Sequence, residues 1–76
     1  MNLKPKKRSL TLHGHQTSVT LEDSFWFAFC NIAKEKNIAI NSLAAKIDAD
    51  RDLRSGFASA QRDFVLHYYI DKSNHI

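Results

Sequence analysis

The helix predicted between about Ser24 and Lys36 is apolar on more sides than a small chain can cover. One stripe at helical spacing contains Phe25, Ala28, Phe29, Ile32 and Ala33. Three more apolar side chains lie off this stripe, namely Trp26, Phe27 and Cys30. Such a helix must be covered on more than one side, and a chain of 76 residues buries only a modest fraction of its surface. We therefore expect a second copy of the chain to supply part of the cover.

Cysteine content narrows the ways in which so small a domain is stabilised. Small domains usually gain stability from disulfides, a metal ion or oligomerisation. Cys30 is the only cysteine, so no disulfide forms within the chain, and this fits a reducing, cytoplasmic compartment. No apolar run approaches the length of a membrane span, and no apolar segment typical of a secretory signal follows the N-terminal lysines. Oligomerisation as a homodimer is the expected route.

Residues 9–21 alternate between polar and apolar side chains, which predicts a half-buried strand. Val19 and Leu21 lie on one face of it with Thr17, and the opposite face carries Gln16, Ser18 and Thr20. Gly14 makes either a hairpin turn or a bulge, so the role of the stretch from Leu10 to Leu12 stays open. A short strand does not stand alone in water. We expect it to pair antiparallel with the same strand of a second copy about a two-fold axis.

Two further helices follow the apolar helix. Asn37 suits a left-handed residue at its C-terminal end. Asn41 or Ser42 then caps a second helix from Leu43 to about Ala49. A third helix is predicted from about Ser55 to Asp71. Its inward residues are Phe57, Ala60, Phe64, Val65, Tyr68 and Tyr69, whereas Gln61, Arg62 and Lys72 are expected to face water. The chain is thus predicted to be mainly α with a short β-strand.

The positive charge is concentrated at the N-terminus. Lys4, Lys6, Lys7 and Arg8 lie in the first fifteen residues, which hold no acidic residue, whereas the rest of the chain carries seven basic and eight acidic side chains. We expect residues 1–8 to form a disordered basic arm ahead of a single domain spanning residues 9–76. Such an arm is typical of nucleic-acid binding, although a solvated tail has the same composition.

The order strand, helix, turn, helix resembles the ribbon-helix-helix family of DNA-binding repressors. The likeness covers residues 16–48, through Thr17-Ser18-Val19-Thr20-Leu21-Glu22, residues 25–33 and Ile40-Asn41-Ser42-Leu43. From Gly14 to Tyr69 the chain is closer to a bacterial subgroup with an added C-terminal helix. That likeness rests on Gly14-His15, Phe25-Trp26, Asn41-Ser42-Leu43, Ile47-Asp48-Ala49 and Phe64-Val65-Leu66-His67-Tyr68-Tyr69. The resemblance implies an intertwined homodimer whose two-stranded ribbon enters the major groove of double-stranded DNA and regulates transcription.

The resemblance also implies which residues contact bases, which contact phosphates and which form the core. The outward strand residues Gln16, Ser18 and Thr20 would contact bases. Asn41 and Ser42 at the second helix would contact phosphates, as would Lys4, Lys6, Lys7 and Arg8 of the arm. The shared core of the dimer would consist of Val19, Leu21, Phe25, Phe29, Ile32, Ile40, Leu43 and Ile47.

One departure from the subgroup leaves a second function open. In the subgroup the outward strand positions are often arginine, whereas this chain has Gln16 and Thr20 there. Because arginine to guanine is the commonest specific contact, the pattern fits modest sequence preference. It also fits an antitoxin-like module that binds a protein partner without base readout.

Other chemistry has little support in the sequence. His13, His15, His67, His75 and Cys30 are irregularly spaced for a zinc site, so we expect no metal. Gly14 and Gly56 are the only glycines, so there is no glycine-rich phosphate loop. We expect neither a cofactor nor an enzymatic activity.

Overall fold

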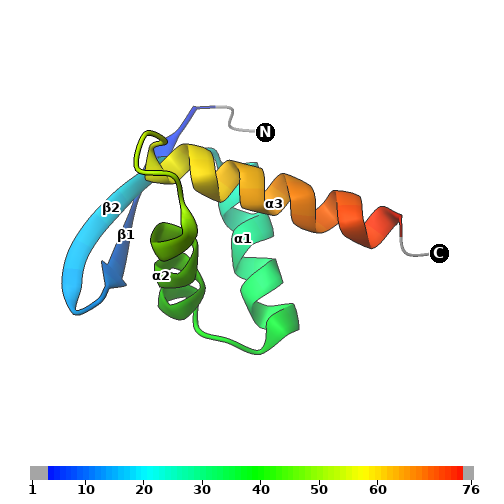
Figure 1. Ribbon diagram of the computed structural model, residues 1–76, viewed down its shortest axis with the longest axis horizontal. Coiled ribbons are helices and arrows are strands. Elements are labelled where there is room, and N and C mark those ends of the chain that lie inside the picture. Colours follow the sequence, from blue (N-terminus) through cyan, green and yellow to red (C-terminus); the bar gives the residue numbers. More distant parts are fainter. Residues whose placement is uncertain (1–3, 75–76) are drawn as a thin grey trace.

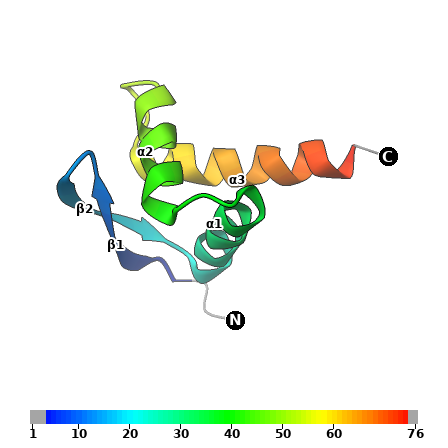
Figure 2. The same ribbon diagram turned by 90° about the horizontal axis from the view of Figure 1, so that it is seen from below.

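A β-hairpin lies on one side of three helices in the computed structural model, which describes residues 4–74 (Figure 1). The elements are β1 (Lys6–Leu12), β2 (His15–Leu21), α1 (Asp23–Lys36), α2 (Ile40–Asp50) and α3 (Phe57–Ser73). The C-terminal part of α3 extends past the other elements (Figures 1 and 2). No helix within residues 4–74 has the length and apolar character needed to span a membrane.

The hairpin is closed by a two-residue turn. Its residues, His13 and Gly14, have φ angles of 53° and 80°, and positive φ at both central positions is typical of the turn that matches the twist of a hairpin. The antiparallel register runs from Leu12 opposite His15 to Lys6 opposite Leu21. Gly14 therefore makes a hairpin, and β2 pairs with β1 of its own chain. A second copy is not needed to complete a two-stranded ribbon.

The predicted boundary of the basic arm at residue 8 is wrong. Residues 6–8 form the first part of β1. Their pairing with residues 19–21 of β2 continues the register of Leu10 and Leu12 toward the N-terminus. Lys4 and Pro5 precede the strand, and residues 1–3 lie outside the described residues.

The helix boundaries follow the sequence prediction closely at α1 and less closely at α2. Asn37 has φ 58°, and its backbone N–H donates to the carbonyls of Ala33 and Lys34, which confirms the left-handed end of α1. In contrast, α2 begins at Ile40 with Ala39 as the residue before it. Asn41 and Ser42 thus lie within the first turn of α2 and do not cap it.

The core of the single chain contains most of the residues that we expected two chains to share. Six of these eight are buried in the chain itself, namely Val19, Leu21, Phe29, Ile32, Leu43 and Ile47. Phe25 is half-buried, and Ile40 is exposed. Within the chain, α3 and α2 pack against α1, and the buried residues of α1 share one cluster with those of the hairpin. Cover of α1 by a second copy stays a prediction.

Gln61 departs from its predicted position. It was expected to face water, but its side chain is fully buried on α3. Phe57 and Val65 stand four residues before and after it, so Gln61 lies on the inward stripe of the helix.

Candidate nucleic-acid interface

The outward face of the hairpin carries six exposed polar side chains from two strands. Residues directly opposite each other in a hairpin share a face. The register pairs Gln16 with Thr11, Ser18 with Ser9 and Thr20 with Lys7. All six are exposed, whereas Leu10, Leu12, Val19 and Leu21 on the other face are buried. The alternation predicted for β2 is therefore confirmed, and β1 adds a second row. We call these six residues the outward face.

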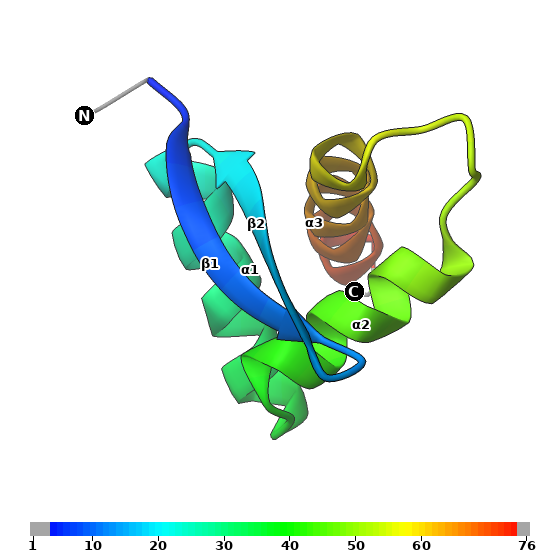
Figure 3. The ribbon, with the colours of Figure 1, turned by 90° about the vertical axis from the view of Figure 1, so that its left-hand side faces the viewer.

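Both edges of the hairpin are contacted by side chains from the helices. Hydrogen-bonded pairs alternate with non-hydrogen-bonded pairs along an antiparallel ladder. In this register the backbone groups of Thr11 and Thr20 point away from the neighbouring strand. The N–H of Thr11 donates to Oδ1 of Asn41 at 3.1 Å, and Nη2 of Arg62 donates to the carbonyl of Thr20 at 3.5 Å. Figure 3 shows α1 behind the hairpin, α2 near its turn and α3 beside β2.

The N-terminus of α2 lies beside the hairpin and has backbone donors available. The bond between Thr11 and Asn41 joins β1 to the first turn of α2. No side chain caps this helix, and the first backbone donation back to its start is from Leu43 to the carbonyl of Ala39. The N–H groups of residues 40–42 therefore point out of the helix end, where the helix dipole favours an anion. Asn41 thus joins the first turn of α2 to the hairpin, and Ser42 lies in the same turn.

The basic residues of the N-terminal stretch have different environments. Lys7 lies on the outward face and is exposed. Lys4 is also exposed. Arg8 points to the other side, where its guanidinium pairs with the carboxylate of Asp23 and lies 5.4 Å from the ring centroid of Trp26. Arg8 thus has an ionic partner within the fold, whereas its contact with phosphate stays a prediction.

Asp23 holds a second cation of the strand. Nζ of Lys6 lies 3.5 Å from Oδ2 of Asp23, and about half of the Lys6 side chain stays exposed. Burial raises the pKa of the Asp23 carboxyl, but the hydrogen bond from Arg8 and the charge of Lys6 outweigh it and lower the pKa below its ordinary value. The pair of strand cations thus keeps Asp23 ionised at the start of α1, where a negative charge also suits the helix dipole.

Arg62 fastens α3 to the end of β2. Its guanidinium donates to both carboxylate oxygens of Glu22, at 2.9 and 3.1 Å. It also lies 5.9 Å from the ring centroid of Phe25. The hydrogen bond from Arg62 lowers the pKa of Glu22. The ion pair holds α3 against the junction between β2 and α1. The sequence predicts that Arg62 faces water, and this pairing with Glu22 was not expected.

Two aromatic side chains of α1, Trp26 and Phe27, lie near Arg8 of β1. Trp26 is half-buried beneath Arg8, and its ring centroid is 6.0 Å from that of Phe29. Phe27 is 62% exposed. The guanidinium of Arg8 also lies 6.0 Å from the ring centroid of Phe27. Cys30 is half-buried, and its burial raises the pKa of the thiol despite the nearby charge of Arg8.

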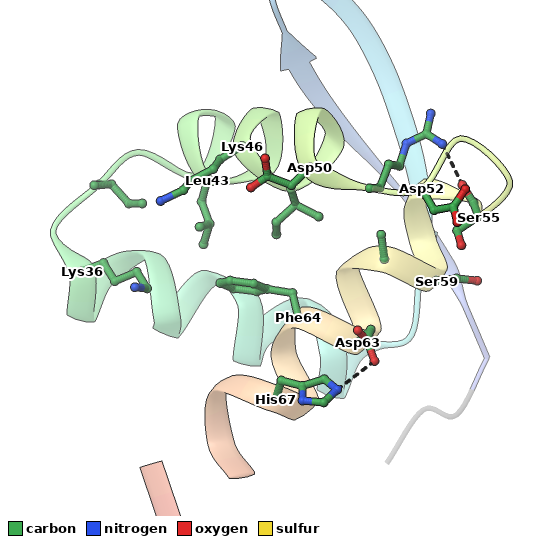
Figure 4. Close-up of a pocket in the computed structure, with 14 residues that line it drawn as sticks. Lys36, Leu43, Lys46, Asp50, Asp52, Ser55, Ser59, Asp63, Phe64 and His67 are labelled. Carbon is green, nitrogen blue, oxygen red and sulfur yellow. Dashed lines mark hydrogen bonds and ion pairs between the residues drawn. The ribbon is translucent and has the colours of Figure 1, made fainter. Parts of the chain in front are cut away.

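A groove of about 700 Å³ lies between α2 and α3. Figure 4 shows Leu43 and Phe64 reaching into it, with charged side chains around the rim. Some of the rim residues bind one another. Oδ1 of Asp63 lies 3.2 Å from Nε2 of His67, and Arg51 donates to the carbonyl of Ser55 at 2.7 Å. Among residues 4–74 no group of three or more His, Cys, Asp or Glu side chains is placed to hold a metal ion. His75 lies outside the described residues.

Comparison with known proteins agrees with this architecture. A family model described as a ribbon-helix-helix domain matches residues 5–69, from the start of β1 to most of α3. No curated protein and no solved structure matches the chain. Ribbon-helix-helix domains generally occur in DNA-binding transcription regulators or antitoxins, and the fold family is not an enzymatic one. Since the match covers most of the chain, this protein belongs to the ribbon-helix-helix family.

Proposed function

We propose that this protein is a transcriptional regulator, acting as a cytoplasmic repressor, that binds double-stranded DNA with a preference for certain sequences. One observation carries the proposal. A ribbon whose outward face is wholly polar and exposed lies beside an uncapped helix N-terminus, and the bond between Thr11 and Asn41 joins the two. The major groove admits two strands side by side, which the β2 strands of two copies would supply, and a free helix N-terminus binds phosphate.

The residues of β2 would read the bases. Gln16 can form a bidentate pair with adenine, and the hydroxyls of Ser18 and Thr20 can bond to several base edges. None of the three has a core role, because all are exposed. Without arginine among them, sequence preference would be modest.

Phosphate contacts would come from α2 and from the exposed lysines. The N–H groups at Asn41 and Ser42 point out of the first turn of α2. Lys7 on the outward face and Lys4 before β1 would neutralise further phosphates. These contacts would fix the orientation of the ribbon and add affinity that salt weakens.

A second copy of the chain would bind through the outer edge of β2. Among residues 4–74, the backbone groups of Gln16 and Ser18 on that edge have no hydrogen-bond partner. An open strand edge is a template for pairing with another chain, and an antiparallel pair of β2 strands about a two-fold axis would satisfy both copies. Family members typically bind DNA as dimers.

A binding titration tests the proposal. Random-sequence duplex DNA would be titrated at two salt concentrations while the mass of the protein in solution is recorded. We expect a dimer whose affinity falls steeply with salt, and sequence selection from the same pool should yield a motif. Replacing Gln16, Ser18 and Thr20 together by Ala should abolish the motif and leave the fold unchanged. A dimer that ignores DNA at low salt would refute the regulator.

That outcome would favour an antitoxin-like function with a protein partner. The observation behind this alternative is on the projecting part of α3, where Leu66 and Ile70 are 54% and 44% exposed and stand one helical turn apart. A protein partner would bury such a pair.

A further inference from the structure

We infer that β1 contacts DNA alongside β2. The side-chain hydroxyls of Ser9 and Thr11 would bond to the sugar-phosphate backbone of the DNA at the wall of the groove. This inference rests on the proposed function and assigns a role to β1, the strand that contains Leu10 and Leu12, whose role the sequence leaves open. Ser9 and Thr11 are exposed and stand opposite Ser18 and Gln16 on the outward face. Whatever surface meets β2 must therefore pass close to them.

The order of elements across the surface places β1 next to the wall of the groove. On one side β1 pairs with β2, and on its other side the N–H of Thr11 bonds to Asn41 at the first turn of α2. If β2 reads bases and α2 holds a phosphate, β1 lies between the two. Neighbouring strands are about 4.8 Å apart, and the major groove is about 12 Å wide. The outward residues of β1 then meet the backbone that flanks the bases.

Pairing of two copies through β2 leads to the same assignment. The sheet would have four strands, with β1 at each margin, and its outer strands would be roughly 14 Å apart. Since this exceeds the width of the groove, about 12 Å, both β1 strands would lie over the groove walls. Only β2 and its symmetry mate would be central enough to reach the bases.

The residue types of β1 suit this role. Lys7, Ser9 and Thr11 form its outward row. A lysine ammonium and small hydroxyls are common donors to phosphate oxygens, and such contacts set register without carrying sequence information. The hydroxyls are uncharged, so they should add affinity without releasing counterions. This property separates them from Lys7 in an experiment.

The test compares two pairs of substitutions in the full chain. In the β1 variant, Ser9→Ala and Thr11→Val remove both hydroxyls. In the β2 variant, Gln16→Ala and Ser18→Ala remove the proposed readers. Ser59→Ala, an exposed position on α3, is the matched control, and melting curves check that each variant folds. Each protein is used for sequence selection from a random duplex pool and for titrations of the selected duplex and of an unselected one.

We expect the β1 variant to select the same motif as the wild type and to bind every duplex more weakly, by about tenfold or more. Its salt dependence should be unchanged, whereas Lys7→Gln should reduce the slope of log affinity against log salt by about one. Thr11→Ser, which keeps the hydroxyl, should bind more tightly than Thr11→Val.

Three results would overturn the inference, and they are distinguishable. A changed motif for the β1 variant would mean that Ser9 and Thr11 read bases. An unchanged affinity, with a β2 variant that loses the motif, would refute the role of β1 alone. Absence of binding by the wild-type protein would refute the proposed function and this inference together.

Discussion

The amide of Gln61 offers a direct test of the core. Its side chain is fully buried, and neither Oε1 nor Nε2 has a hydrogen-bond partner among residues 4–74. A buried polar group without a partner costs about 1–3 kcal/mol relative to one that is satisfied. Methionine has a similar unbranched shape and no such group. We expect Gln61→Met to raise the free energy of unfolding by about 1–3 kcal/mol, which for a domain of this size is roughly 5–20 °C in melting temperature.

Urea unfolding followed by circular dichroism would measure this change. The protein concentration must be equal for both proteins, because association shifts apparent stability, and an unchanged slope against urea would show that the unfolded state is unaffected. Gln61→Glu is the matched control, since a buried carboxylate should destabilise the protein strongly near neutral pH. If Gln61→Met unfolded at the same urea concentration as the wild type, or at a lower one, the amide would be hydrogen-bonded in the folded protein and the reasoning would be refuted.

Three other predictions concern the turn, the core and the ion pairs. Gly14→Ala should lower stability by about 1 kcal/mol, because a Cβ there meets no atom within 4 Å but φ is +80°; an unchanged melting temperature would contradict this turn. Phe29→Ala should cost roughly 3–5 kcal/mol in urea unfolding by opening a cavity at a fully buried site, and near-wild-type stability would show that the core is assigned incorrectly. Hydrogen bonds from Tyr68 and Lys72 lower the pKa of Glu35 from its ordinary value of 4.5. These bonds therefore stabilise the folded protein fully above the ordinary pKa, and this stabilisation is lost as the pH falls through the lowered pKa. The urea midpoint of Glu35→Gln should thus fall less than that of the wild type on acidification from about pH 5 to pH 3, and parallel curves would refute this linkage.

Sequence patterning predicted β2 and the start and end of α1 because local rules decide them. The alternation through Val19 and Leu21 was enough to identify the buried face of the strand. Asn37 was identified as the end of α1 because few residues adopt a left-handed conformation readily. These features depend on neighbours within a few positions along the chain.

The features that sequence patterning missed depend on contacts between distant segments. The acidic partner of Arg8 is fifteen positions away, so only the fold shows that this arginine is internal. Its alternation with Leu10 and Leu12 was hidden by the high charge and the proline before it. Gln61 was placed in water because of its polarity, although it stands at helical spacing between Phe57 and Val65. At both positions the place along the strand or helix, and not the polarity of the side chain, determines burial.

The two faces of the hairpin separate the proposed DNA contacts from the core. Leu10, Leu12, Val19 and Leu21 are buried in the core, so changes there affect stability first. The side chains of the outward face are exposed, and substitutions at such positions usually change stability by less than about 0.5 kcal/mol. Lys6 and Arg8 differ from Lys7 in this respect, because both are tied to Asp23. A loss of DNA binding in an Arg8 variant would therefore report on the junction of β1 with α1, whereas the same loss in a Lys7 variant would report on the DNA contact itself.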